Sequence, residues 1–188
     1  NLWSVKINIL IVNPKSTMKK LLLIIAMAIT VSCFSQAITV STNTYSVPQL
    51  VNTVLINSPC VSAQNITWKT GTNFSSSNGI GFFQNSNPNF PMNSGVILST
   101  GDITHAAGPN TTFFFFFAAN WPGDTDLEST LLQSGITMNS VNATILEFDF
   151  TPISPTFNFE FLFASEEYGN IQCQFSDAFA FLLTNTTT

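Results

Sequence analysis

The sequence predicts an all-β protein, mainly an antiparallel β-sandwich, with one short helix near the amino-terminal end of the folded part. Phenylalanines in the last third alternate with other residues at the period of two that is typical of a half-buried strand. Residues 64–94 are rich in Asn, Ser, Gly and Thr, with apolar residues between them, as in short strands joined by turns. Hydrophobic residues make up 45% of the 188 positions and charged residues 8%, so the chain can form a core and is neither disordered nor a coiled coil.

Residues 18–37 have the organisation of a secretory signal peptide. Two lysines follow Met18, an apolar run covers residues 21–31, and small residues lead to Ala37. This run is too short to span a bilayer. We therefore expect cleavage after Ala37 and export of the remaining chain.

This cleavage divides the sequence into three parts. Residues 1–17 are expected to be an upstream extension without structure, and residues 38–188 are expected to form the β-sandwich domain. Lipidation at Cys33 is the alternative, although Thr30-Val31-Ser32 is a poor lipobox. The mature chain has no apolar run long enough for a transmembrane helix.

The mature chain is strongly acidic. All ten acidic residues lie at Asp102 or later, and Lys69 is the one cation after residue 37, which leaves a net charge of −9. The whole sequence contains no arginine, so an electrostatic contact with nucleic acid phosphates is excluded as a function. Such a surface suits solubility or the binding of cations.

Cys60 and Cys173 are the two cysteines of the mature chain. An even number of cysteines in an exported protein predicts a disulfide bond between them. The bond would close a loop of 113 residues, worth about 4–5 kcal/mol in the chain-entropy model.

The first elements can be assigned in order along the chain. A helix is predicted to begin at Ser46, with Pro48 in its first turn and with an apolar stripe over residues 50–55. Short strands are expected within residues 64–94. Residues 95–101, an apolar run bounded by glycines, predict a buried strand.

Residues 102–134 return to turn-forming composition and predict a long, packed loop of the Ω type. Phe113–Phe117 form an aromatic run within it that has no helical or strand period. We expect this run to be buried, because large exposed apolar patches are rare on soluble proteins; the alternative is an anchor for a partner or a membrane.

The last third predicts three strands, at residues 146–150, 157–163 and 175–183. Their phenylalanines would form one aromatic inner face, for which a second sheet is the natural partner. Residues 184–188 follow without a further strand, so we expect the last sheet to be incomplete.

Catalytic patterns are scarce. His105 is the one histidine, and Ser165 does not lie in a G-x-S-x-G elbow, so nucleophilic catalysis has little support. Glu147 and Asp149 project from one strand face about 7 Å apart, a separation compatible with an inverting glycosidase. The alternative is a solvated outer face, which every half-exposed strand requires.

Acidic residues in the loops predict a calcium site, because calcium takes six to eight oxygen ligands in flexible geometry. The spacing is not that of an EF-hand, and turns contain Asp for backbone reasons alone, which is the structural alternative. No other cofactor is expected. The candidate ligands are Asp124, Asp126, Glu166, Glu167 and Asp177.

Several motifs resemble the choice-of-anchor L domain family of exported surface proteins of Bacteroidetes-like bacteria. Phe163–Tyr168, with the sequence Phe-Ala-Ser-Glu-Glu-Tyr, is the most specific of them. The resemblance covers about residues 45–184. The other matching segments are Ser94–Gly101, Gly108–Asn110, Gly123–Leu127, Ala143–Phe150, Cys173 and Asp177–Phe181.

The resemblance implies an extracellular domain in proteins whose carboxyl-terminal anchoring or sorting signal varies, including type IX secretion signals. It implies no established reaction. The family usually continues past the third strand with a Gly-Pro-Gly-like turn, whereas this chain has Thr184-Asn185-Thr186. The run Phe113–Phe117 is not a family feature either.

Two functions follow as hypotheses. The first is a non-enzymatic secreted or cell-surface module for adhesion or ligand binding within a larger exported protein, with a glycan or a surface protein as its extracellular ligand. The alternative is a glycan-active domain. That domain would be a lectin with a loop aromatic such as Trp121, or a hydrolase using Glu147 with Asp149 or the Glu166-Glu167 pair.

Overall fold

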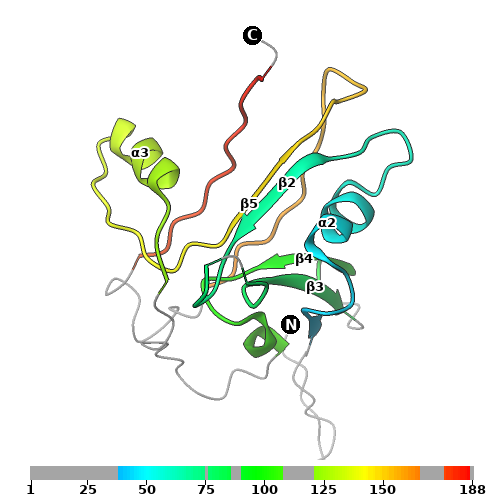
Figure 1. The fold of residues 1–188 in the computed structure, drawn as a ribbon, viewed down its shortest axis with the longest axis horizontal. Coiled ribbons are helices and arrows are strands. Elements are labelled where there is room, and N and C mark those ends of the chain that lie inside the picture. Colours follow the sequence, from blue (N-terminus) through cyan, green and yellow to red (C-terminus); the bar gives the residue numbers. More distant parts are fainter. Residues whose placement is uncertain (1–37, 75, 86–89, 108–120, 166–175, 187–188) are drawn as a thin grey trace, which may run out of the picture. The chain divides into compact units, whose positions relative to one another are not determined.

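The computed structural model describes residues 38–74, 76–85, 90–107, 121–165 and 176–186. They belong to the second of the two units into which the chain divides, Gln36–Thr188. Its strands form antiparallel sheets beside a short amino-terminal helix, so the predicted all-β class is confirmed (Figure 1). The predicted signal peptide, the upstream extension and Cys33 lie outside the described residues. No helix within the described ranges is long and apolar enough to cross a membrane.

The first sheet has three strands. Strand β3 (Ile80–Asn85) lies at its centre and pairs antiparallel with β1 (Ile38–Ser41) and with β4 (Ser94–Leu98). Strand β1 was not predicted from the sequence. Strand β4 was predicted as buried, but its residues are half-buried or exposed.

The second sheet pairs β2 (Gln64–Lys69) with β5 (Ile145–Asp149) in antiparallel order. Its register shifts between Gln64 and Thr67, and Asn65 there has φ 50°. Asparagine tolerates this left-handed conformation better than most residues, so it suits the bulge.

The predicted amino-terminal helix is confirmed. It consists of α2 (Val47–Gln49), which continues as a π-helical segment, Leu50–Ile56. The amide of Ser46 donates to Oε1 of Gln49 at 2.8 Å, one half of a capping box. Asn57 ends the helix in the left-handed conformation, and its amide donates to the carbonyl of Asn52.

One apolar core joins this helix to both sheets. Val47 and Leu50 from the helix and Ile80 from β3 form its buried centre. The partly buried residues around it come from both sheets: Ile66 and Trp68 of β2, Phe82 of β3, Val96 of β4 and Leu146 of β5. The helix therefore packs against residues of both sheets.

A hydroxyl cluster joins the ends of four strands. Thr70, fully buried after β2, has its hydroxyl 2.8 Å from that of Thr144, which precedes β5. Thr144 also donates to the carbonyl of Ser99, after β4. Gly79 lies against all three of these residues just before β3. We call these four residues the strand-end junction.

The loop predicted over residues 102–134 contains regular structure. Ile103–Ala107 form a 3-10 turn and α3 (Thr125–Gln133) is a nine-residue helix, so the prediction of a continuous loop over residues 102–134 was wrong. The reason is that Asp124, counted as a turn residue, is a helix N-cap, and its side chain accepts from the amide of Leu127 at 2.6 Å. The run Phe113–Phe117 lies outside the described residues.

The prediction for the last third is confirmed in part. Residues 146–150 correspond to β5, but residues 157–163 and the described part of 175–183 form no strand. Period-two alternation predicts extended backbone, whereas a strand also needs a hydrogen-bonded neighbour in register. Neither segment is a strand in the described part of the chain, and the aromatic rings that they carry remain exposed.

Candidate functional site

The acidic residues around α3 have structural partners. Asp124 caps the helix, and Oε1 of Glu128 accepts from both the amide and the hydroxyl of Ser140 at 2.7 Å. The Ser140 hydroxyl in turn accepts from the amide of Asp124 at 2.8 Å. These donors lower the pKa of Glu128, the side-chain hydroxyl contributing most. This arrangement attaches α3 to the chain leading into β5.

The predicted calcium ligands do not converge among the described residues. Asp124 and Asp126 both lie at the start of α3, and Asp177 lies in the extended segment near the carboxyl end. Glu166 and Glu167 lie outside the described residues. In the part of the chain that the structure describes, no three His, Cys, Asp or Glu residues are grouped as a metal site would require.

Trp121 does not offer a surface for sugar binding. Its side chain is 4% exposed, and its indole N–H donates to the carbonyl of Ala143 at 2.9 Å. Its amide donates to Oδ1 of Asn142, and Asn142 returns a backbone hydrogen bond. The burial of Trp121 does not support the sugar-binding role considered for it in the lectin alternative, because this tryptophan anchors the segment before α3 to the chain that leads into β5.

Glu147 and Asp149 lie on the exposed face of β5, as predicted. Each accepts a hydrogen bond from the neighbouring strand β2: Glu147 from the Thr67 hydroxyl at 3.1 Å, and Asp149 from the Asn65 amide group at 2.6 Å. Cross-strand polar pairs of this kind stabilise a two-stranded sheet.

Cys60 is exposed and forms no disulfide bond with any described residue. Its predicted partner, Cys173, lies outside the described residues.

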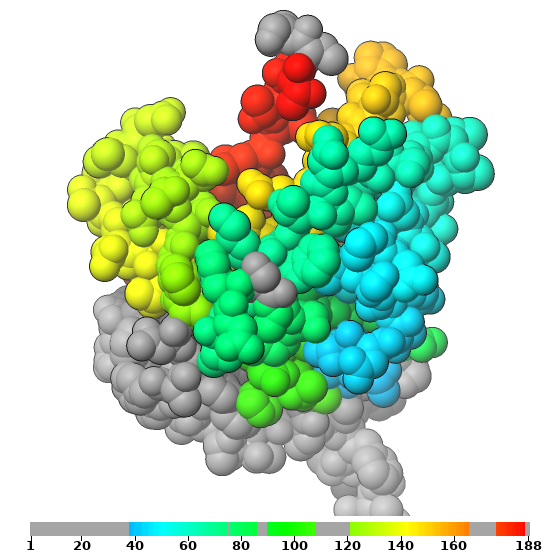
Figure 2. Space-filling model, viewed as in Figure 1, coloured from blue at the N-terminus to red at the C-terminus, as the bar shows by residue number. Residues whose placement is uncertain are grey.

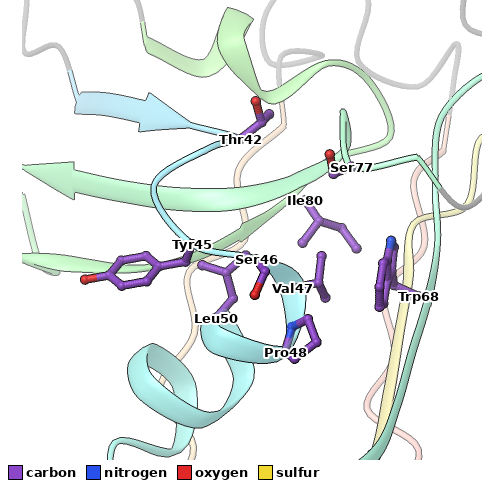
Figure 3. A pocket seen from close by; sticks show the side chains of 9 residues that line it. All are labelled: Thr42, Tyr45, Ser46, Val47, Pro48, Leu50, Trp68, Ser77 and Ile80. Atoms are coloured by element: carbon purple, nitrogen blue, oxygen red, sulfur yellow. The ribbon is translucent and has the colours of Figure 1, made fainter.

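A small pocket lies between the helix and the two sheets (Figure 3). The indole of Trp68 faces Val47, Pro48 and Ile80, and the pocket volume is about 220 Å³. The indole N–H of Trp68 is buried without a described hydrogen-bond partner. Ligand pockets usually begin at about 300 Å³, so this space is a gap in core packing rather than a binding site.

The most unusual surface is a set of exposed aromatic rings, which we call the phenylalanine ladder. Rings from two segments meet in antiparallel order: Phe159 lies 4.2 Å from Phe181, and Phe161 lies 5.4 Å from Phe179, between ring centroids. All are between 43% and 59% exposed. Figure 2 shows residues 176–186, in red, reaching the surface. The ladder consists of Phe159, Phe161, Phe163, Phe179 and Phe181.

The ladder was visible in the sequence as alternating phenylalanines, but its exposure was not. These rings were expected to form an inner face covered by a second sheet. The ring contacts confirm that the two segments face each other. Whether they are covered is decided by the rest of the tertiary structure, and among the described residues nothing buries them.

The fold and surface define an all-β module in which Asp124 and Glu128 fix the helix α3 and the rings of the phenylalanine ladder are exposed. A family model, the choice-of-anchor L domain, matches residues 39–188. The chain therefore belongs to this family, and the resemblance seen in its motifs is confirmed. Choice-of-anchor domains are modules of extracellular, surface-associated proteins, so this chain is secreted or lies at a cell surface. Neither a curated protein nor a solved structure is significantly similar to it.

Proposed function

We propose that this chain is a non-enzymatic binding module of a surface-associated protein and that it binds through the phenylalanine ladder. The observation that carries the proposal is the exposure of all five rings of the ladder. Contiguous apolar patches of this size on soluble proteins usually mark interaction sites. Its ligand is an apolar surface of an extracellular partner.

The engagement of the acidic side chains supports a non-enzymatic role. An inverting glycosidase places a sugar and a water molecule between its two carboxyl groups. Glu147 and Asp149 instead project side by side from one strand and accept hydrogen bonds from Thr67 and Asn65. Asp124 and Glu128 are likewise occupied by the cap of α3 and by Ser140.

Binding and catalysis can be separated with two paired variants of the full chain. The chain carrying Phe161→Ser and Phe179→Ser is expected to lose retention on cells that produce the protein, measured with a fluorescent label. The chain carrying Glu147→Gln and Asp149→Asn is expected to keep it. Leu132→Ser, which removes another exposed apolar side chain, is the matched control and should also keep it.

Two results would contradict this proposal. One is equal retention of the ladder variant and of Leu132→Ser. The other is release of reducing sugar from a polysaccharide panel that disappears in the variant of Glu147 and Asp149, because such turnover would identify a hydrolase.

We also propose that export removes residues 1–37. The family match begins at residue 39, which supports a domain boundary at the predicted cleavage site. The intact mass of the protein recovered outside producing cells should correspond to a chain beginning at Ile38. A chain that retains residues 18–37 would contradict cleavage, and a diacylated chain beginning at Cys33 would identify a lipoprotein.

The proposal of a calcium site can be tested at the start of α3. Asn is as good an N-cap as Asp, so Asp124→Asn should keep the capping hydrogen bond but remove a charged calcium ligand. If calcium binds there, the wild-type Tm rises with calcium by the mass-action amount, and the rise is lost in the variant. Equal Tm values of the wild type in calcium and in excess chelator would exclude a stabilising calcium ion.

A further inference from the structure

We propose that the phenylalanine ladder is a self-association surface, on which the ladder of a second copy of this chain docks to form a symmetric dimer. The inference rests on the proposed function, because it names the partner of the same surface. Three observations carry it: the exposed apolar area, the internal order of the rings, and the absence of charge among them.

The exposed area matches what one side of a stable dimer needs. About half of the surface of each ladder ring is exposed, and an aromatic side chain can bury about 150–250 Å². The five rings therefore leave about 500 Å² of apolar surface open. One side of a standard interface buries about 800 Å², of which a little over half, roughly 450 Å², is apolar.

The rings form one continuous apolar row. Phe159 pairs with Phe181 and Phe161 pairs with Phe179, so the two segments run antiparallel, and Phe163 adds a third ring of the first segment beside Phe179. A surface of this kind can meet its own copy across a two-fold axis, where each ring of one protomer contacts rings of the other. Aromatic rings are also the side chains most enriched at the centres of interfaces.

Charge predicts how this association responds to salt. The five ladder residues are uncharged, whereas the chain as a whole carries a formal net charge of −5. Two acidic copies repel each other at a distance, and salt screens this repulsion without weakening apolar contacts. The dimer should therefore become tighter as the ionic strength rises from about 0.05 M to 0.5 M.

Sedimentation velocity of the full chain tests the proposal. The wild type should sediment as a monomer–dimer equilibrium. Combining Phe161→Ser with Phe179→Ser should raise the dimer dissociation constant at least about 30-fold, the effect of losing one interface hot spot. Leu132 is also an apolar side chain, lies on α3 and is 62% exposed, so Leu132→Ser is the matched control. It should change the dimer dissociation constant by no more than a factor of about two.

The full chain could also associate through the apolar run 21–31. The ladder variant retains this run, so association through it would persist in the variant, whereas a dimer formed through the ladder would be lost. If the ladder variant does not fold, hydrogen exchange of the wild-type chain at several protein concentrations tests the dimer instead. Amide hydrogen exchange at residues 157–163 and 177–183 should slow as protein concentration rises. The proposal is wrong if exchange there is independent of concentration, or if the wild type is monomeric at about 100 μM in 0.5 M salt.

These outcomes separate the inference from the proposed function. A monomeric chain whose retention on cells still depends on the ladder would overturn the dimer and leave the binding module intact. A dimer that forms through the ladder, with retention on cells unaffected by ladder variants, would support the inference and overturn the ladder as the surface that holds the chain on cells.

Discussion

Alanine at Gly79 should disrupt the strand-end junction. A Cβ atom at this position would collide with Oγ1 of Thr70 and lie 2.7 Å from Oγ1 of Thr144 and 2.8 Å from the carbonyl oxygen of Ser99. The backbone at Gly79 is not in the left-handed region, so the penalty comes from these atoms and not from the dihedral angles. The hydroxyl groups must move apart to admit the methyl group.

The magnitude follows from the bonds that would be lost. The hydroxyl contact between Thr70 and Thr144 and the bond from Thr144 to the Ser99 carbonyl both cross this space. A buried polar group left without a partner costs about 1–3 kcal/mol, whereas the entropy change from Gly to Ala returns about 0.4–1 kcal/mol. Loss of both bonds would cost about 2–6 kcal/mol, so we expect a net loss of about 1–5 kcal/mol in the free energy of unfolding.

Urea unfolding followed by tryptophan fluorescence measures this loss, with Gly101→Ala as the matched control. A Cβ at Gly101 has its nearest neighbour, the Ser99 hydroxyl, at 3.9 Å, so this substitution should be neutral or slightly stabilising. A double variant with Thr70→Ala should lose less stability than the sum of its single changes, because the smaller side chain makes room. Equal unfolding midpoints for Gly79→Ala and Gly101→Ala would refute this account of the junction.

Three further predictions concern the acidic and thiol groups. Asp124→Ala removes the N-cap of α3 and should lower the free energy of unfolding by about 0.5–2 kcal/mol in the same urea assay, whereas Asp124→Asn should not. Because the pKa of Glu128 is lower in the folded chain than its ordinary value of 4.5, the ionised carboxylate stabilises the folded chain above pH 4.5. This stabilisation should disappear as the pH falls through the folded-state pKa. Glu128→Gln should therefore flatten that part of a profile of Tm against pH. If Cys60 and Cys173 form a disulfide bond, non-reducing peptide mapping will recover their peptides joined, and reduction should lower stability by about 4–5 kcal/mol; separate peptides would contradict the bond.

Local signals in the sequence were sufficient for several elements. Ser46 and Pro48 mark the start of the first helix, and alternation around Leu146 and Phe148 marks β5. These features depend on side chains within one turn or one strand, so their physics is contained in a short window. The family could also be identified from motifs alone, and the match over residues 39–188 confirms it.

Other features depend on residues far apart in the chain. Trp121 looked like a loop aromatic, but its indole N–H finds the carbonyl of Ala143 and its ring is buried. Asp124 looked like a turn residue, but its amide donates to the hydroxyl of Ser140, 16 residues further along the chain. In each case the residue type alone did not determine the role of the side chain. The same side chain can bind several kinds of partner, and the fold decides which of them lies next to it.

The sequence by itself determined the class of protein, its acidic character and the alternation that makes phenylalanines face one another. These properties follow from composition and from the fixed period of the backbone. Only the tertiary structure decided which apolar side chains are covered: Ile80 is buried against the helix, whereas Phe161 remains 59% exposed. Burial depends on what lies opposite a side chain in space, and a pattern along one strand carries no information about the element that faces it.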